Sequence, residues 1–225
     1  MKKVVLFYGA PGSGKGTQAD LLAKNYGFYH FDTGKNIEQT VNDPENLKDE
    51  NIRKEKEIFD SGKLNTPSWV LNDVVIKKTQ NLAKAGVRLV FSGSPRTLFE
   101  AFGDEKQIGL IKTLENLYGK ENIGIMYIEV KPETSVFRNS NRLVCSVCGA
   151  PVLYKENGLT TCPFCDAPLR KRSLDNPETI KVRLEEYKNR TQPIIEKLKE
   201  QGYEINMIDG EPEPYKVFEQ IKNRI

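Results

Sequence analysis

Residues 9–17 read Gly-Ala-Pro-Gly-Ser-Gly-Lys-Gly-Thr, and they directly follow the apolar run VVLFY at residues 4–8. The apolar run predicts a buried strand, and residues 18–24 (QADLLAK) predict a helix behind the glycine-rich loop. Glycines in this loop let the backbone curl so that several N–H groups point at one spot. The start of the helix adds partial positive charge there, and Lys15 adds a full charge. The sequence therefore predicts a loop that holds a polyphosphate.

The composition is that of an ordinary folded chain. The 225 residues are 38% hydrophobic and 29% charged, with a formal net charge of +3. This length suits one α/β domain with insertions, and the small net charge does not favour nucleic acid or an acidic membrane as a partner. No leader is recognised, and no stretch reaches the roughly 20 apolar residues that a membrane span needs. We therefore expect a cytoplasmic protein.

Strands and helices alternate along the chain, which favours a parallel sheet with helices on both faces. Strands are predicted at residues 4–8, 27–31, 87–91, 123–130 and 203–208. Helices are predicted at 70–85, 176–201 and 213–225, and a polar, mostly helical region at 33–67. Residues 139–175 break the alternation, because they hold all four cysteines and many turn formers. The pattern predicts an α/β core with two insertions.

The cysteines form two Cys-x-x-Cys pairs separated by thirteen residues, namely Cys145, Cys148, Cys162 and Cys165. Each pair makes a tight turn that offers two thiolates, and two pairs can complete a tetrahedral zinc site. Disulfides are the competing interpretation, which the expected cytoplasmic setting disfavours, and a redox pair fits two matched pairs less well. A zinc ribbon can also bind nucleic acid, and residues 170–172 (RKR) are basic. We favour zinc with a structural role, since four thiolates leave no open position.

The phosphate loop has an unusual form, because Gly16 separates Lys15 from the hydroxyl of Thr17. The general loop has Ser or Thr directly after the lysine. The Gly-Lys-Gly-Thr form resembles the nucleoside monophosphate kinases, and the adenylate kinase family in particular, over nearly the whole chain. The resemblance implies a P-loop kinase core with a five-stranded parallel sheet flanked by helices (1–32, 68–138 and 176–225), a helical domain that binds the nucleoside monophosphate acceptor (33–67) and a zinc-binding lid (139–175).

The resemblance implies reversible, Mg²⁺-dependent phosphoryl transfer, in which ATP and AMP give two ADP. An oxygen of the acceptor phosphate attacks, so catalysis rests on positioning and on cations that stabilise the transition state. The cations implied as catalytic are Lys15, Arg96, Arg138, Arg142, Arg172 and Arg183. The implied ATP site consists of Gly12, Ser13, Gly14, Lys15, Gly16, Thr17, Arg138, Arg142 and the main chain near Pro212.

An acceptor site is implied by the same resemblance. Ser94-Pro95-Arg96-Thr97 is similar to the family motif whose arginine grips the acceptor phosphate. The implied AMP-binding residues are Thr33, Gly34, Lys35, Lys63, Leu64, Asn65, Gly93, Arg96, Glu100, Arg172 and Arg183.

Three acceptor-side positions depart from the family pattern. Glu38 stands in place of an arginine, and Lys35, three residues earlier on the same helix face, is the expected substitute. Ser92 replaces an aspartate that the family uses, through water, near magnesium. Glu100 replaces a glutamine that reads adenine. An ionised Glu100 only accepts hydrogen bonds and would suit guanine, a protonated one would mimic glutamine, and a third possibility is that it faces solvent.

Three functions stay open at this point. The first is an adenylate kinase, and the second is the same reaction with GMP or another acceptor. The third is a non-catalytic nucleotide-binding or zinc-ribbon interaction protein, which the changes at residues 38 and 92 support. We expect small nucleotides as partners, no nucleic acid or membrane, Mg²⁺ with ATP, structural Zn²⁺ and a monomer. His30, the only histidine, lies in a predicted strand, where a structural role is expected.

Overall fold

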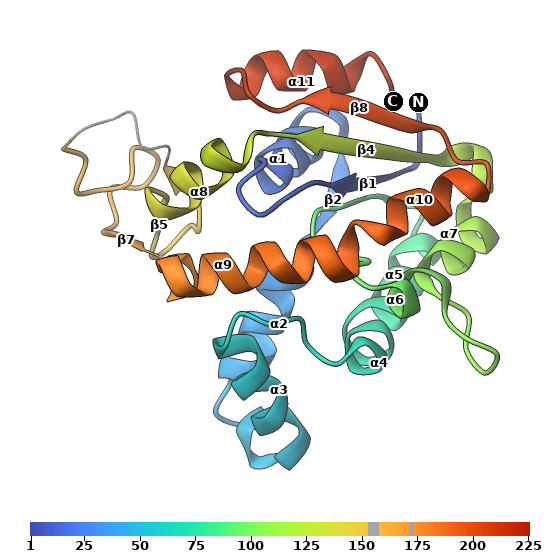
Figure 1. Ribbon diagram of the computed structural model, residues 1–225, viewed down its shortest axis with the longest axis horizontal. Coiled ribbons are helices and arrows are strands. Elements are labelled where there is room, and N and C mark those ends of the chain that lie inside the picture. The colour runs from blue at the N-terminus through green and yellow to red at the C-terminus, as the bar shows by residue number, and fades with distance from the viewer. Residues whose placement is uncertain (153–157, 172) are drawn as a thin grey trace.

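A five-stranded parallel sheet forms the centre of the computed structural model, which describes residues 1–152, 158–171 and 173–225 (Figure 1). Its strands are β1 (Val4–Tyr8), β2 (Phe28–Phe31), β3 (Arg88–Phe91), β4 (Ile123–Glu129) and β8 (Ile205–Asp209). They lie in the order β2-β3-β1-β4-β8, and all neighbouring strands are parallel. The predicted α/β class with five parallel strands is confirmed.

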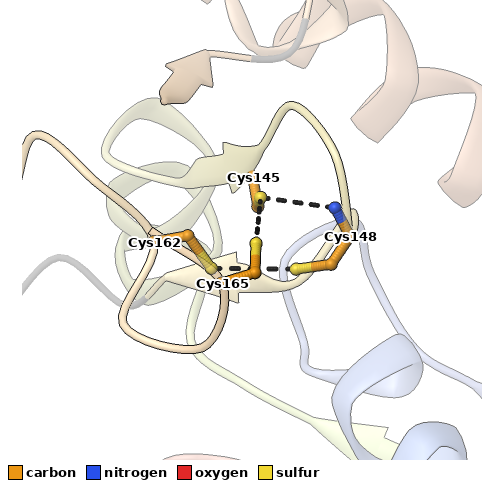
Figure 2. Close-up of side chains that lie close together, drawn as sticks. All are labelled: Cys145, Cys148, Cys162 and Cys165. Atoms are coloured by element: carbon orange, nitrogen blue, oxygen red, sulfur yellow. Dashed lines mark hydrogen bonds between the residues drawn. The ribbon is translucent and has the colours of Figure 1, made fainter. Parts of the chain in front are cut away.

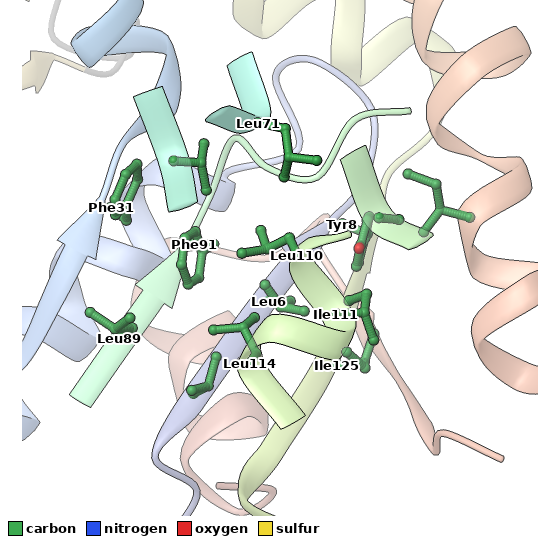
Figure 3. Close-up of a cluster of buried hydrophobic side chains, with 14 of the residues drawn as sticks. Leu6, Tyr8, Phe31, Leu71, Leu89, Phe91, Leu110, Ile111, Leu114 and Ile125 are labelled. Carbon is green, nitrogen blue, oxygen red and sulfur yellow. The ribbon is translucent and has the colours of Figure 1, made fainter. Parts of the chain in front are cut away.

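Both faces of the sheet are buried, because alternate residues of β1 enter two different hydrophobic clusters. Leu6 and Tyr8 belong to the larger cluster, which Figure 3 shows in part. Val5 and Phe7 belong to the smaller one. The larger cluster is covered by α7 (Leu110–Tyr118), α10 (Pro193–Glu200) and the π-helical η2 (Val70–Ile76), and the smaller by α1 (Lys15–Tyr26) and α11 (Pro214–Lys222). Burial on both faces explains why β1 reads as an unbroken apolar run.

The carboxyl ends of the strands meet at one edge, where open α/β sheets bind their ligands. β1 leads into the glycine-rich loop, and β2 leads into α2 (Thr33–Asn42). β3 is followed by residues 92–97 and α6 (Leu98–Phe102), and β4 by α8 (Pro132–Ser140). Four segments far apart in the sequence therefore surround one site.

Two segments extend from this core. The first contains α2, the short 3₁₀ helix η1 (Asn46–Lys48) and α3 (Glu50–Asp60). The second holds an antiparallel sheet of β5 (Leu143–Cys145), β6 (Pro151–Val152) and β7 (Leu169–Lys171), in the order β6-β5-β7. It is followed by η4 (Ser173–Asp175) and α9 (Pro177–Glu186), and it lies beyond α8 at one end of the molecule in Figure 1. None of the described helices has the length and apolar character needed to cross a membrane.

Two predicted boundaries are wrong, and one predicted helix is interrupted. The helix expected from residue 70 begins earlier, with α4 (Pro67–Trp69), and continues through η2 into α5 (Lys77–Lys84), because a proline suits the first position of a helix. The helix expected over 176–201 contains a π-helical turn, η5 (Tyr187–Thr191), since Pro193 has no N–H for the regular ladder. The last strand begins two residues late, because the N–H of Tyr203 still bonds to the Leu198 carbonyl of α10, at 3.0 Å. The η3 turn (Lys120–Asn122), α6, α7 and α8 were not predicted.

Candidate functional site

The glycine-rich loop between β1 and α1 has the geometry of an anion site. Gly12 and Gly14 have φ angles of 83° and 97°, which residues with a side chain rarely adopt. A Cβ on Gly12 would also lie 2.5 Å from Nδ2 of Asn139 in α8, whereas one on Gly14 would meet nothing within 4 Å. Since α1 begins at Lys15, its unpaired N–H groups lie directly behind the loop.

Lys15 folds back over this loop. Its Nζ donates to the carbonyl oxygens of Gly9 and Ala10 at 2.7 and 2.8 Å. Burial holds the pKa of Lys15 well below its usual value, and the nearby positive charges of Arg96, Arg183 and Arg142 lower it further. Cations from three other segments thus converge on Lys15, and a polyanion would relieve their mutual repulsion.

Arg142 and Arg183 share one buried carboxylate. Nε and Nη2 of Arg142 donate to the two oxygens of Asp175 at 2.8 and 2.7 Å, which is a bidentate pair. Nη1 of Arg183 donates to Oδ1 of Asp175 at 3.1 Å. The Asp175 side chain is 1% exposed, whereas the arginines keep 24% and 18% of their side-chain surface in solvent. This carboxylate therefore holds the end of α8 and the start of α9 together, with both guanidinium groups beside the loop.

Arg96 lies at the end of β3, against the start of α2. A Cβ on Gly93 would be 3.3 Å from both Nη2 of Arg96 and Cβ of Thr33, so a side chain there would push these two groups apart by a few tenths of an ångström. The hydroxyls of Thr33 and Ser94 are buried without a hydrogen-bond partner among the described residues. Buried hydroxyls beside a guanidinium group are donors that a phosphate could use.

Glu100 does not face solvent, so that alternative is wrong. The residue is 3% exposed. Its Oε2 accepts from the N–H of Arg96 at 3.0 Å, and its Oε1 accepts from the hydroxyl of Thr97 at 3.1 Å. Thr97 in turn accepts from the N–H of Glu100 and caps α6. Burial raises the pKa of Glu100, and these hydrogen bonds and Arg96 oppose that shift.

Arg138 binds the loop that follows β8. Its guanidinium donates to the carbonyls of Gly210 and Glu211 at 2.8 and 3.0 Å, and so holds the loop that carries Pro212 against α8. Arg172 lies outside the described residues, so the structure gives it no position.

The remaining acceptor-side positions are residues 63–65 and the charged residues Lys35 and Glu38 of α2. Nδ2 of Asn65 donates to the carbonyl and to Oε2 of Glu55, both at 2.8 Å, so this side chain is buried away from the loop. The N–H of Leu64 donates to Oε2 of Glu186 in α9 at 3.1 Å. Lys63 and Lys35 are exposed and Glu38 is half-buried. A Cβ on Gly149, between the cysteine pairs, would lie 3.7 Å from Nζ of Lys35.

The four cysteines form one cluster, as Figure 2 shows. All four are free thiols, and their sulfur atoms lie within 4.8 Å of one another, with Cys145–Cys165 at 3.5 Å and Cys148–Cys162 at 3.7 Å. A tetrahedral zinc ion with bonds of about 2.3 Å needs sulfurs about 3.8 Å apart. Burial raises the pKa of Cys145, but N–H donors from Val147 and Cys148 lower it to about 6 overall. The N–H of Ala150 lowers the pKa of Cys148, but hydrogen bonds with the other thiols raise it to about 11 overall, so the cluster favours the thiolate that a metal binds at Cys145.

The sequence interpretation missed a series of hydrogen bonds that links three side chains. Nδ1 of His30 lies 2.7 Å from Oδ1 of Asp20, and its Nε2 lies 2.7 Å from Oγ of Ser92. The three residues come from α1, β2 and the end of β3. Their spacing in the sequence carries no signal, because only the strand order, which puts β2 beside β3, brings them together.

The fold and the site define a class of protein. A phosphate loop follows the first strand, cations from other segments surround it, and a second polar site lies at the end of β3. This arrangement is that of a P-loop kinase, which positions two phosphate-bearing substrates for direct transfer.

Comparison with known proteins identifies the family. Residues 7–203 match the family model described as Adenylate kinase. A protein of Caldicellulosiruptor saccharolyticus named adenylate kinase is 34% identical over 216 residues, which cover 94% of this chain and 93% of that protein. An adenylate kinase of Mycoplasma capricolum is 32% identical, over 98% of both chains, and one of Caldicellulosiruptor bescii is 35% identical over 88% and 87%. The chain belongs to the adenylate kinase family and is a nucleoside monophosphate kinase, which confirms the predicted family and enzyme class.

Proposed function

We propose that the chain transfers a phosphoryl group between ATP and AMP, with Mg²⁺ bound to the ATP. The observation that carries this proposal is the convergence of Arg96, Arg142 and Arg183 on the half-buried Lys15. Transfer between two nucleotides brings many negative charges together, and these cations would stabilise that charge. The names of the relatives support ATP and AMP as the pair of substrates.

On the donor side, N–H groups of the loop and of the first turn of α1 would bind the ATP phosphates, together with Lys15. Arg142 and Arg183 would stabilise the negative charge of the phosphoryl group during its transfer. Thr17, half-buried in the first turn of α1, offers a hydroxyl oxygen of the kind that Mg²⁺ binds, and phosphate oxygens and water would complete its shell. Mg²⁺ would neutralise phosphate charge. No nucleophile from the protein is needed, since an oxygen of the acceptor phosphate attacks.

On the acceptor side, Arg96 and the hydroxyl of Thr33 would bind the AMP phosphate. We prefer AMP to GMP because the chain belongs to the adenylate kinase family. Each oxygen of Glu100 already accepts one hydrogen bond from the protein, so fewer of its lone pairs stay free for the two donors of guanine.

We also propose that residues 33–67 bind the acceptor and that residues 139–175 act as a lid held by structural zinc. The close sulfur atoms support the zinc, and a closed four-thiolate shell would leave it no catalytic position. The approach of Lys35 to Gly149 supports a lid that meets the acceptor domain. The monomeric state and the cytoplasmic location stay predictions, and size-exclusion chromatography tests the first.

Replacing Lys15 by alanine tests the phosphate loop as the centre of this activity. Turnover should fall by about 10²–10³-fold or more, the scale for loss of one preorganised charge donor, while the fold and the zinc content persist. Lys24→Ala is the matched control, since Lys24 is exposed in the last turn of the same helix. Full activity in Lys15→Ala would contradict the proposal. A wild type that binds nucleotide without transferring phosphate would establish the non-catalytic alternative.

A further inference from the structure

The π-helical turn η5 interrupts the helix between α9 and α10, and the proposed mechanism does not use it. The N–H of Gln192 bonds to the carbonyl of Tyr187 at 2.9 Å, which is the spacing of a π-helix. Single π-helical turns within α-helices are rare and occur frequently at functional sites. Two side chains of η5 contact the sheet and its loops. The hydroxyl of Tyr187 donates to the hydroxyl of Tyr127 in β4, and the hydroxyl of Thr191 donates to the carbonyl of Arg96 beyond β3, both at 2.8 Å.

The hydrogen bond from Thr191 is buried and joins distant parts of the chain. Thr191 is 8% exposed, and it lies 95 residues after Arg96 in the sequence. A threonine hydroxyl in a helix commonly donates to a carbonyl three or four residues earlier in the same helix. Thr113 of α7 does so, since it donates to the carbonyl of Gly109 at 2.9 Å. Thr191 instead donates to another segment, the one that carries Arg96.

Side chains hold both backbone polar groups of Arg96. Its N–H donates to Oε2 of Glu100 at 3.0 Å, and its carbonyl accepts from Thr191. The guanidinium of Arg96 lies against the start of α2, where a Cβ on Gly34 would be 3.9 Å from Nη2. A binding group is placed accurately only when the hydrogen bonds around it fix the segment that carries it. The two bonds from α6 and η5 therefore fix the backbone from which the Arg96 side chain extends.

We propose that Thr191 is a positioning residue, whose hydrogen bond to the carbonyl of Arg96 aims the Arg96 guanidinium at the phosphate of the acceptor. The inference rests on the proposed function, in which Arg96 binds that phosphate. Without the hydroxyl, the Arg96 carbonyl loses this donor and the segment can shift. A misplacement of about 1 Å in a substrate-positioning group can cost about 10²-fold in rate. The ATP site uses the phosphate loop and other arginines, so its affinity should not depend on Thr191.

Thr191→Val tests this role, because it removes the hydroxyl and keeps the branched shape of the side chain. The kcat/KM for AMP should fall by about 3- to 10-fold or more, the worth of one hydrogen bond, while the affinity for a non-hydrolysable ATP analogue, measured by calorimetry without AMP, should stay within about twofold. Thr191→Ala should give the same result, and Thr191→Ser, which keeps the hydroxyl, should restore most of the efficiency. Thr113→Val is the matched control, since it removes a buried hydroxyl that donates to a carbonyl within α7, and it should change neither quantity.

A double-mutant cycle with Arg96→Ala separates positioning from a merely structural role. If Thr191 acts through the Arg96 side chain, adding Thr191→Val to Arg96→Ala should cause no further loss of kcat/KM for AMP. Equal losses in both backgrounds, a parallel loss of ATP affinity, or no loss in Thr191→Val alone would each overturn the inference. Failure of the proposed function gives a different result, because Arg96→Ala would then keep full efficiency with AMP, and the role of Thr191 would fall with that of Arg96.

Discussion

Glu100 is a buried carboxylate whose hydrogen bonds stay within its own turn and helix. It accepts from the N–H of Arg96 and from the hydroxyl of Thr97, the residue that caps α6. This arrangement is close to a capping box, in which a Thr and a Glu three residues apart satisfy the start of a helix. A buried charge is costly even with such partners, which is why burial raises the pKa of Glu100. Its main effect should be on the stability of the end of β3.

Replacing Glu100 by glutamine should change how stability depends on pH. Since the folded pKa of Glu100 lies above the unfolded value, its contribution is fully present below the unfolded pKa and is lost as the pH rises through the folded pKa. Glu100→Gln removes this loss. Its free energy of unfolding, measured in urea from pH 4.5 to pH 8, should therefore rise relative to wild type as the pH increases. Glu105→Gln, at an exposed position, should show no such trend. A constant difference between Glu100→Gln and wild type would contradict this prediction.

Among elements, α8 and α9 are joined through Asp175. The carboxylate takes three donors from Arg142 and Arg183, both of which the proposed mechanism assigns to phosphate. The Asp175 carboxylate thus neutralises part of the positive charge that the phosphates of bound nucleotides would also neutralise. Asn139 of α8 also packs against Gly12 of the phosphate loop. The helix that leads into the cysteine-containing segment is therefore in direct contact with this loop.

Asp175→Asn should destabilise the protein by about 2–3 kcal/mol, below the usual cost of breaking a buried ion pair because the arginines stay partly in water. Urea unfolding measures this cost. Asp60→Asn is the control, since it breaks the exposed pair of Asp60 with Lys56 and should cost less than about 1 kcal/mol. Equal costs for the two variants would show that the Asp175 cluster adds nothing to stability.

The folding of the antiparallel sheet with the four cysteines should require a bound metal, whereas the folding of the core should not. Protein purified under reducing conditions should hold about one zinc ion per chain, and removing it with a chelator should lower the melting temperature while the circular dichroism of the core persists. Cys165→Ser should reproduce the effect, and Ser146→Ala, beside Cys145, is the control. A metal-free protein after this purification would refute the zinc assignment.

For the whole molecule, the sequence predicts best what is local. The strand, loop and helix at residues 4–24 and the cysteine pairs carry their signal in short spacings, and the structure contains each of them. The π-helical turn η5 has a local signal in Pro193, which the sequence interpretation did not use, whereas η2 has no such signal within its own residues. The burial of Glu100 and the hydrogen bonds of His30 have no local signal either, because they depend on contacts between distant segments.

Contacts between the three parts of the molecule support a site that closes around two substrates. Leu64, at the end of the helical insertion, donates to Glu186 in α9, and Lys35 in α2 approaches Gly149 of the cysteine-containing segment. Closure of this kind would exclude water from the transferred phosphoryl group.

The most direct test of the central claim is a coupled assay of ADP formation from ATP and Mg²⁺ with AMP, GMP, CMP or UMP as acceptor. We predict turnover with AMP, at an efficiency at least about tenfold above that with the other three acceptors, since contacts in the site must discriminate the acceptor base. Undetectable turnover of AMP, with or without turnover of GMP, would contradict this prediction.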